Sequence, residues 1–163
     1  MENLQILKDK IVSFEQLPAL LNQWELKEEK IVFTNGCFDI LHQGHIDYLA
    51  KASDLGTKLI VGVNSDSSVR TLNKGTNRPL QDEESRAMII AALHVVDKVI
   101  IFDDSTPLNL IEQVKPKVLV KGSDYSIKEI VGHEVVLENG GEVIPIDFLP
   151  GHSTSSIINR ACE

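Results

Sequence analysis

The sequence predicts an α/β fold: a doubly wound, mostly parallel sheet of five strands with helices on both faces. Short apolar runs rich in branched residues alternate with segments of helical spacing, and this alternation is typical of parallel sheets. The chain contains neither an internal repeat nor a low-complexity tract. The expected strands are 31–33, 58–64, 97–102, 116–120 and 142–148.

Length and composition describe one ordinary globular domain. The chain has 163 residues, of which 42% are hydrophobic and 25% are charged, enough to bury a full core. The net charge of −8 argues against nucleic-acid partners, whose phosphates attract basic surfaces. No apolar run approaches the roughly 20 residues of a membrane span, and the first residues lack the apolar core of a signal peptide. With two cysteines and no disulfide framework, we expect a cytoplasmic protein.

Residues 1–29 are expected to form a helical extension before the domain at 30–163. Ser13 and Gln16 have the spacing of a capping box, and apolar residues then recur at helical intervals as far as Trp24. This apolar stripe could pack on the outside of the domain or on a partner subunit. The sequence leaves both arrangements open.

The stretch Lys30–His45, KIVFTNGCFDILHQGH, carries the strongest functional signal. An Asn-Gly pair ends an apolar strand, and the letters HQGH open a helical pattern. Helix starts attract anions through their unpaired N–H groups and the helix dipole, and Gly44 would let a phosphate approach the backbone. His42 and His45 are three residues apart, so both imidazoles should face one side and donate hydrogen bonds to a phosphate.

The same stretch is also compatible with a metal site or with a purely structural role. The histidine pair could be half of a metal site, with Cys37 and Asp39 as the nearby ligand candidates. The stretch could also be an ordinary joint between a strand and a helix. A phosphate site accounts for the whole unit best, because the strand end, the glycine and the histidines all serve it.

Cationic residues follow the next expected strand. A short helix over 66–73 leads to a polar loop at 74–79, where Lys74 and Arg78 could clamp phosphates or simply lie in solvent. Arg86 lies in the first turns of a helix expected over 82–94. A cation there opposes the helix dipole, so we expect either an ion pair or a phosphate to hold it.

The second half of the chain adds two further candidate sites. Lys121, Gly122 and Asp124 follow an apolar strand and form either a ligand pocket or a connecting turn. Pro145 places the last strand at an edge of the sheet. Four hydroxyl side chains at 153–156 then crowd the start of an amphipathic helix, where they form either a second anion site or a plain N-cap.

The motif TNGCFDILHQGH resembles the signature of the nucleotidyltransferase superfamily, whose His-x-Gly-His follows the first strand of a Rossmann-like sheet. Class I aminoacyl-tRNA synthetases carry a related motif, but a tRNA ligase is not expected of a short, acidic chain. From about residue 11 onwards the chain is similar to one branch, the heptose 1-phosphate adenylyltransferases. The matching stretches are TNGCFDILHQGH, LIVGVNSDSSV, the 74–79 loop, VLVKGSDY, ENGGEV and HSTSSII.

The resemblance implies transfer of AMP from ATP to D-glycero-D-manno-heptose 1-phosphate, giving ADP-heptose and pyrophosphate, with Mg²⁺ as cofactor. It suggests a homodimer and a separate heptose 7-phosphate kinase, and no nucleic-acid or membrane partner. The residues expected to act in catalysis are His42, His45 and Lys74. Those expected to bind the nucleotide are Asn35, Gly36, Cys37, Phe38, Gly44, Lys121, Gly122, Ser153, Thr154 and Ser155. Those expected to bind the acceptor substrate are Asp39, Arg78, Arg86 and Asp124, and no residue is assigned to a metal.

The tail departs from the superfamily pattern Ile-Ser-Ser-Thr-x-x-Arg, with His152 in place of the Ile and Ile158 in place of the Arg. Arg160 lies two residues later, and its role stays open. His94 stands where relatives that use glycerol phosphate carry Arg. The alternatives are another acceptor, such as glycerol 3-phosphate with CTP or flavin mononucleotide with ATP, or a nucleotide-binding subunit without catalysis.

Overall fold

The computed structural model describes residues 2–72, 78–123 and 126–161. Their core is a five-stranded sheet in the order β3-β2-β1-β4-β5, and every strand pair is parallel. The predicted fold class is therefore confirmed. The strands are β1 (Ile31–Gly36), β2 (Lys58–Asn64), β3 (Lys98–Phe102), β4 (Val118–Gly122) and β5 (Glu142–Ile146).

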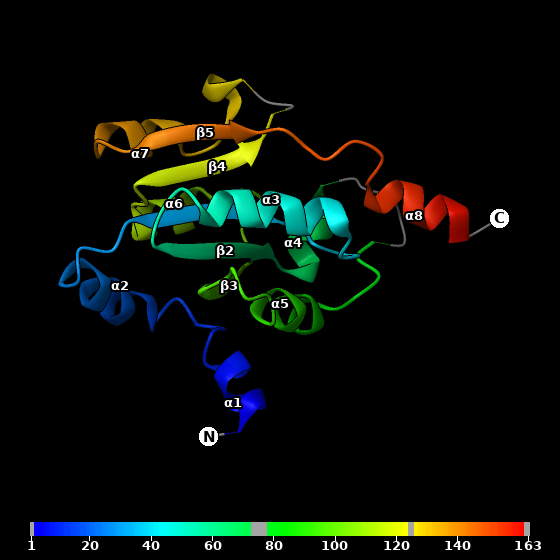
Figure 1. Ribbon diagram of the computed structural model, residues 1–163, viewed down its shortest axis with the longest axis horizontal. Helices are drawn as coiled ribbons and strands as arrows, with labels where there is room; N and C mark the ends of the chain where they lie inside the picture. Colours follow the sequence, from blue (N-terminus) through cyan, green and yellow to red (C-terminus); the bar gives the residue numbers. More distant parts are fainter. Residues whose placement is uncertain (1, 73–77, 124–125, 162–163) are drawn as a thin grey trace.

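Helices cover both faces of the sheet (Figure 1). Apolar residues of α3 and α5 pack on one face, and those of α2, α6 and α7 pack on the other. None of the helices in the described segments is long and apolar enough to span a membrane. The helical elements are α1 (Asn3–Lys8), α2 (Leu17–Glu25), α3 (Gln43–Ser53), α4 (Asp66–Thr71), α5 (Glu83–Ala91), α6 (Leu108–Val114), the 3₁₀ helix η1 (Ile127–Glu129), α7 (His133–Glu138) and α8 (Thr154–Ala161).

The central strand β1 is buried from both sides. Val32 packs with the α3 face, and the next residue, Phe33, packs with the α6 face; neither side chain is exposed. Successive side chains of a strand point to opposite faces, so a strand between two helical layers carries apolar side chains on both of its faces. This explains why its sequence is a continuous apolar run rather than an alternating one.

Two expectations about the later strands have different outcomes. The last strand lies at an edge, as Pro145 predicted. The fourth strand, however, continues to Gly122 instead of ending at Val120, because pairing with β5 continues through Lys121–Pro145 and Gly122–Ile146. Lys121 and Gly122 are thus strand residues, held by the sheet, and not part of the following turn.

The strand order reverses between β1 and β4. The chain builds β2 and β3 on one side of β1, then crosses over through α6 to β4 on the other. Within the described residues, the ladder between β1 and β4 consists of Val32–Val118 and Phe33–Leu119. The carboxyl ends of these two strands therefore diverge, and ligands of open α/β sheets bind at such a point.

The N-terminal extension packs on the domain itself. Leu17 and Trp24 of α2 are buried among residues of the sheet and α6. Before α2, Ile11 bridges to Val99 of β3, and the Val12 N–H donates to the Val99 carbonyl at 2.9 Å. The extension thus forms a single parallel bridge beside the edge strand β3. Of the two arrangements left open by the sequence, packing on the domain is the one that the structure shows.

We expect Leu17→Ala to lower the free energy of unfolding by about 2–5 kcal/mol, because it would leave a cavity under α2. The matched control is Leu26→Ala, at the end of the same helix, where the side chain is 87% exposed. That change should stay within about 0.5 kcal/mol. Urea unfolding followed by circular dichroism measures both, and equal effects would mean that α2 does not belong to the folded core.

Candidate active site

The two motif histidines lie at the start of α3, as predicted. His42 is the N-cap residue, with extended backbone angles, and His45 occupies the first turn. Their imidazole rings stack with centroids 3.8 Å apart and planes 22° apart. Phe38 meets the His45 ring edge-on at 5.2 Å. The two imidazoles therefore form one aromatic unit on one side of the helix start.

Gly44 allows the tail of the chain to reach this unit. A Cβ atom at this position would lie 3.1 Å from the His42 ring and 3.1 Å from Cβ of His152, tighter than ordinary contact. Burial lowers the pKa of His42, and the charge of His152 lowers it further. Neutral imidazole is thus the main form of His42 at pH 7.

A cleft beside the histidines has a volume of about 470 Å³ and is lined by β1, α3, β4 and α8. We call it the histidine cleft. It contains His45 of the helix start together with Thr154 and Ser155 of the tail, which are 109 and 110 positions further along the chain. The predicted site residues that line it are Asn35, Gly36, Cys37, Phe38, Asp39, His45, Arg78, Lys121, Gly122, Thr154 and Ser155.

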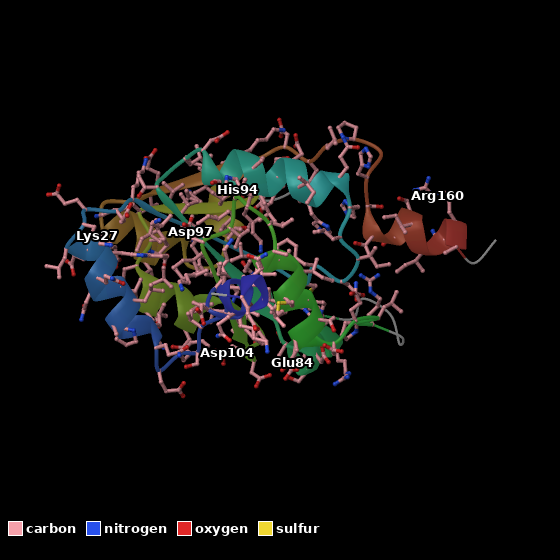
Figure 2. All side chains as sticks on the ribbon, turned by 60° about the horizontal axis from the view of Figure 1, so that its bottom comes forward. Lys27, Glu84, His94, Asp97, Asp104 and Arg160 are labelled. Carbon is pink, nitrogen blue, oxygen red and sulfur yellow. The ribbon has the colours of Figure 1, made fainter. Side chains whose placement is uncertain are left out.

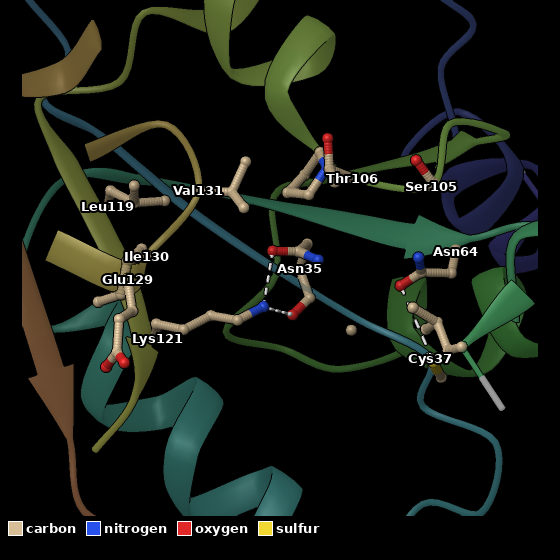
Figure 3. A pocket seen from close by; sticks show the side chains of 13 residues that line it. Asn35, Cys37, Asn64, Ser105, Thr106, Leu119, Lys121, Glu129, Ile130 and Val131 are labelled. Atoms are coloured by element: carbon tan, nitrogen blue, oxygen red, sulfur yellow. Dashed lines mark hydrogen bonds between the residues drawn. The ribbon is translucent and has the colours of Figure 1, made fainter. Parts of the chain in front are cut away.

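A second cavity of about 260 Å³ lies over the ends of β1, β2 and β4, between the loop before α6 and the segment after η1 (Figure 3). We call it the strand-end pocket. Leu119, Ile130 and Val131 give it an apolar wall, and Asn64, Thr106 and Glu129 add polar groups. The two cavities share four lining residues: Asn35, Gly36, Cys37 and Lys121.

Lys121 stands at the divergence of β1 and β4. Its ammonium group lies 2.9 Å from the side-chain oxygen of Asn35 and 3.4 Å from the Asn35 carbonyl (Figure 3). The contact places a cation on the wall common to both cavities. Because the cavities meet where parallel strands end, an anionic group in either one would lie near this cation.

Aromatic side chains form another part of the histidine cleft. The Tyr48 hydroxyl and the Thr34 hydroxyl lie 2.7 Å apart, and burial raises the pKa of Tyr48 to about 12. The Phe148 ring lies 5.9 Å from that of Tyr48. A Cβ at Gly122 would come within 2.1 Å of the Phe148 ring, so only glycine fits under it.

Asp39 lines the histidine cleft, and its carboxylate is also bound to the 78–81 segment. It is 1% exposed, and one carboxylate oxygen accepts the N–H groups of Leu80 and Gln81 at 2.7 and 3.1 Å. The other oxygen forms an ion pair with Arg78. Asp39 thus anchors the 78–81 segment and holds Arg78 against the histidine cleft, which Arg78 lines.

The Arg86 guanidinium is enclosed by the protein. Its side chain is 0% exposed, and it forms an ion pair with Asp66 at 2.7 Å. The sequence left an ion pair and a phosphate open as its partner, and the ion pair is the one present. Arg86 lines neither cavity, so its contact with a substrate stays a prediction.

The tail serves two purposes. The Ser153 hydroxyl accepts the Ser156 N–H at 3.1 Å, which is an N-cap bond, while Thr154 and Ser155 line the histidine cleft. Arg160 is exposed at the far end of α8, opposite the end of the molecule that carries Lys27 (Figure 2). It lines neither cavity, and its role stays open.

Comparison with known families shows which family the chain belongs to. A sequence model of the cytidylyltransferase-like family matches residues 33–160, which include both cavities' shared wall. The chain belongs to this family.

Lys74 and Asp124, two further predicted site residues, lie outside the described residues.

Curated relatives of this family member are longer proteins. The "bifunctional protein HldE" of Rhodopseudomonas palustris strain BisA53 is 58% identical over 86% of the chain and 29% of its own length. The protein of the same name from Nitrobacter hamburgensis is 52% identical over 91% of the chain and 30% of its own length. The chain thus spans about a third of the curated relatives it matches.

Solved structures show the same fold. A lipopolysaccharide core biosynthesis protein from Thermoplasma volcanium is 32% identical, with a TM-score of 0.60, over 74% of this chain and 97% of that one. A pantoate-beta-alanine ligase from Francisella tularensis, complexed with beta-gamma ATP and beta-alanine, is 18% identical with a TM-score of 0.63. It covers 89% of this chain and 68% of the ligase, a likeness of fold alone.

Sequence reasoning missed several residues that line the two cavities. Asn64 ends β2 and lines the strand-end pocket, so the rule of strand ends could have found it. Tyr48 follows His45 by three positions on α3 and shares its face. Phe148 had no local signal, because only the approach of the β5–α8 connection to Gly122 brings its ring to the cleft.

We expect His152→Gln to raise the pKa of His42, because it removes one of the two causes that lower it. Burial remains, so the pKa of His42 should still lie below its ordinary value. NMR titration of the imidazole C–H signals measures this shift. The control His133→Gln, on α7, should leave the His42 titration unchanged, and a similar absence of effect at His152 would contradict the packing of the tail on Gly44.

Proposed function

We propose that this protein transfers AMP from ATP to D-glycero-D-manno-heptose 1-phosphate, giving ADP-heptose and pyrophosphate. The observation that carries the proposal is the shared wall of the histidine cleft and the strand-end pocket. Two cavities that meet at one cation suit two anionic substrates whose phosphates must touch. Family membership supports nucleotidyl transfer as the reaction class.

The histidine cleft is the proposed site of ATP. Its volume of about 470 Å³ exceeds the 260 Å³ of the strand-end pocket, and ATP is the larger of the two substrates. His45, Thr154 and Ser155 supply hydrogen-bond donors for phosphate oxygens, and the aromatic pair Tyr48 and Phe148 supplies an apolar surface for the base. The smaller pocket would take the sugar phosphate, with the polar groups of Thr106 and Glu129 near the sugar hydroxyls.

The reaction we propose is a direct displacement. An oxygen of the sugar phosphate attacks the α-phosphorus of ATP, and the bond from that phosphorus to the bridging oxygen breaks. Pyrophosphate leaves with the bonding electron pair. The attacking oxygen is already ionised near pH 7, since the second pKa of a phosphate monoester is about 6, so no catalytic base is needed. The histidines and Lys121 would act by positioning the phosphates and stabilising their charge.

Mg²⁺ is part of this proposal through the nucleotide. Within the described ranges, no group of three or more acidic, histidine or cysteine side chains could hold a metal ion, and the carboxylate of Asp39 is bound to backbone N–H groups. Mg²⁺ is commonly held by substrate phosphates and water rather than by a protein cage. Bound in this way, it would offset triphosphate charge that His45 and Lys121 alone do not.

The heptose acceptor rests on the resemblance in sequence to heptose 1-phosphate adenylyltransferases and on the 51–58% identity to HldE proteins. His94, which replaces the Arg of glycerol phosphate enzymes, is exposed and lines neither cavity, and this disfavours glycerol 3-phosphate.

Pyrophosphate release across a panel of acceptors and nucleotides tests the proposal. The panel contains both anomers of heptose 1-phosphate, glycerol 3-phosphate and flavin mononucleotide, each with ATP and with CTP. We expect release with ATP and one heptose 1-phosphate anomer. Pyrophosphate release with another acceptor would mean that this acceptor, and not the heptose, is the substrate. ATP binding without any pyrophosphate release would favour a regulatory subunit.

We expect His45→Ala to lower kcat by about 10²- to 10³-fold, because it removes a donor that stabilises phosphate charge in the transition state. The fold should be retained, since His45 is only half-buried at the surface of α3. Steady-state kinetics and a thermal melt measure the two effects. The control His94→Ala removes an exposed imidazole outside the cavities and should leave kcat unchanged; near-normal turnover of His45→Ala would exclude the role given to this residue.

A further inference from the structure

Arg86 is the largest of the side chains that the structure buries completely. Its guanidinium donates hydrogen bonds to four acceptor groups. Nη1 donates to the carbonyls of Cys37 and Asn64 at 2.7 and 2.6 Å, and Nη2 donates to the carboxylate of Asp66 at 2.7 Å. Nε donates to the carbonyl of Gln81 at 3.0 Å. One side chain thus joins the segments after β1 and β2 to the start of α4 and the turn before α5.

Two of these acceptors belong to the walls of the cavities. Cys37 lines both the histidine cleft and the strand-end pocket, and Asn64 lines the strand-end pocket. Arg86 lines neither cavity. It binds the carbonyl oxygens of Cys37 and Asn64 from the buried side of the cavity walls. The distance between the loop after β1 and the end of β2 is therefore set by one planar group with fixed N–H directions.

Asp39 reinforces the same junction from the other side. Its carboxylate accepts the N–H groups of Leu80 and Gln81, and the Gln81 side-chain amide donates to the Asp39 carbonyl at 2.5 Å. Gln81 is also the residue whose carbonyl accepts from Arg86. Arg86, Asp39 and Gln81 thus form one connected network, which we call the buried clamp.

Stability alone does not explain a buried guanidinium. Removing a charge from water is costly, and an apolar side chain of similar volume is often as stable or more so. The clamp instead satisfies backbone carbonyls at the ends of β1 and β2, and it does so with directional bonds. Such a group defines one geometry of the loop and excludes others.

We propose that Arg86 is a positioning residue for nucleotidyl transfer. It sets the separation of the loop after β1 and the end of β2, so that the donor and acceptor phosphates meet in line. This inference rests on the proposed function. A displacement of about 1 Å between reacting groups can cost roughly 10²-fold in rate. Loss of the clamp should therefore affect the chemical step more than the binding of either substrate.

The test compares Arg86→Lys, Arg86→Met and Asp66→Asn with wild type. Arg86→Lys keeps the charge but loses the fork, and Asp66→Asn keeps Arg86 while removing the charge of its partner. The matched control is Asp97→Asn. Asp97 pairs with Lys58 at 3.1 Å and accepts the Leu59 N–H at 2.8 Å, so it too joins two strands, but at the amino ends, away from the cavities.

We expect kcat to fall by about 10- to 100-fold in Arg86→Lys and by less in Asp66→Asn, while KM for ATP and for the acceptor changes by less than about threefold. Asp97→Asn should lower the thermal midpoint without changing kcat. If Arg86→Met fails to fold, the other two variants decide the matter. Wild-type kcat in folded Arg86→Lys and Asp66→Asn, or an equal kcat loss in Asp97→Asn, would overturn the proposal.

Hydrogen exchange separates failure of the clamp from failure of the proposed function. In the protein without substrates, amide exchange across residues 37–39 and 64–66 should be faster in Arg86→Lys than in wild type and unchanged in Asp97→Asn. The measurement needs no acceptor, so it stands even if no sugar phosphate is a substrate. Equal protection in Arg86→Lys and wild type would show that Arg86 does not shape the loop.

Discussion

The divergence of β1 and β4 is the constraint on which the rest of this structure depends. In a parallel sheet whose order reverses, the two strands beside the reversal send their following segments to opposite faces, and a hollow remains between them. Here the segment after β1 leads to α3 on one face, while the segment after β4 leads to η1 and α7 on the other. Lys121 and Asn35 span the hollow with a 2.9 Å contact, so two cavities form around one cation.

Close approach of backbone segments then decides which side chains reach the cavities. Gly44 brings His152 and the tail against the histidine pair, and Gly122 accepts the ring of Phe148. Neither glycine has a positive φ angle. What matters is that they lack a Cβ, so other segments can pack closely against them. Thr154 and Ser155 of α8 can then line the same cleft as His45, which is more than a hundred positions earlier in the chain. Figure 1 shows α8 beyond the carboxyl ends of the strands, where the Thr154 hydroxyl also donates to the Ile40 carbonyl at 3.4 Å.

Two buried charged residues, Asp39 and Arg86, bind neighbouring segments of the protein. Arg86 and Asp39 both lie next to the expected site, and both carry charges that could have served a substrate there. The structure gives their charges to neighbouring segments instead, through Asp66, Leu80 and Gln81. A charged residue near a site can thus hold the backbone segments that form its walls.

The sequence by itself determined the sheet, its five strands, the edge position of β5 and the histidine pair at a helix start, because these follow from local periodicity, turn residues and the geometry of a single helical turn. It also indicated that the strand ends and the tail would supply a site. Only the tertiary structure decided that Lys121 is a strand residue, that Arg86 and Asp39 are internal, and that Tyr48, Asn64 and Phe148 complete the cavities. The physical reason is that burial and pairing partners depend on segments distant in the chain, and no local pattern records which of them will meet.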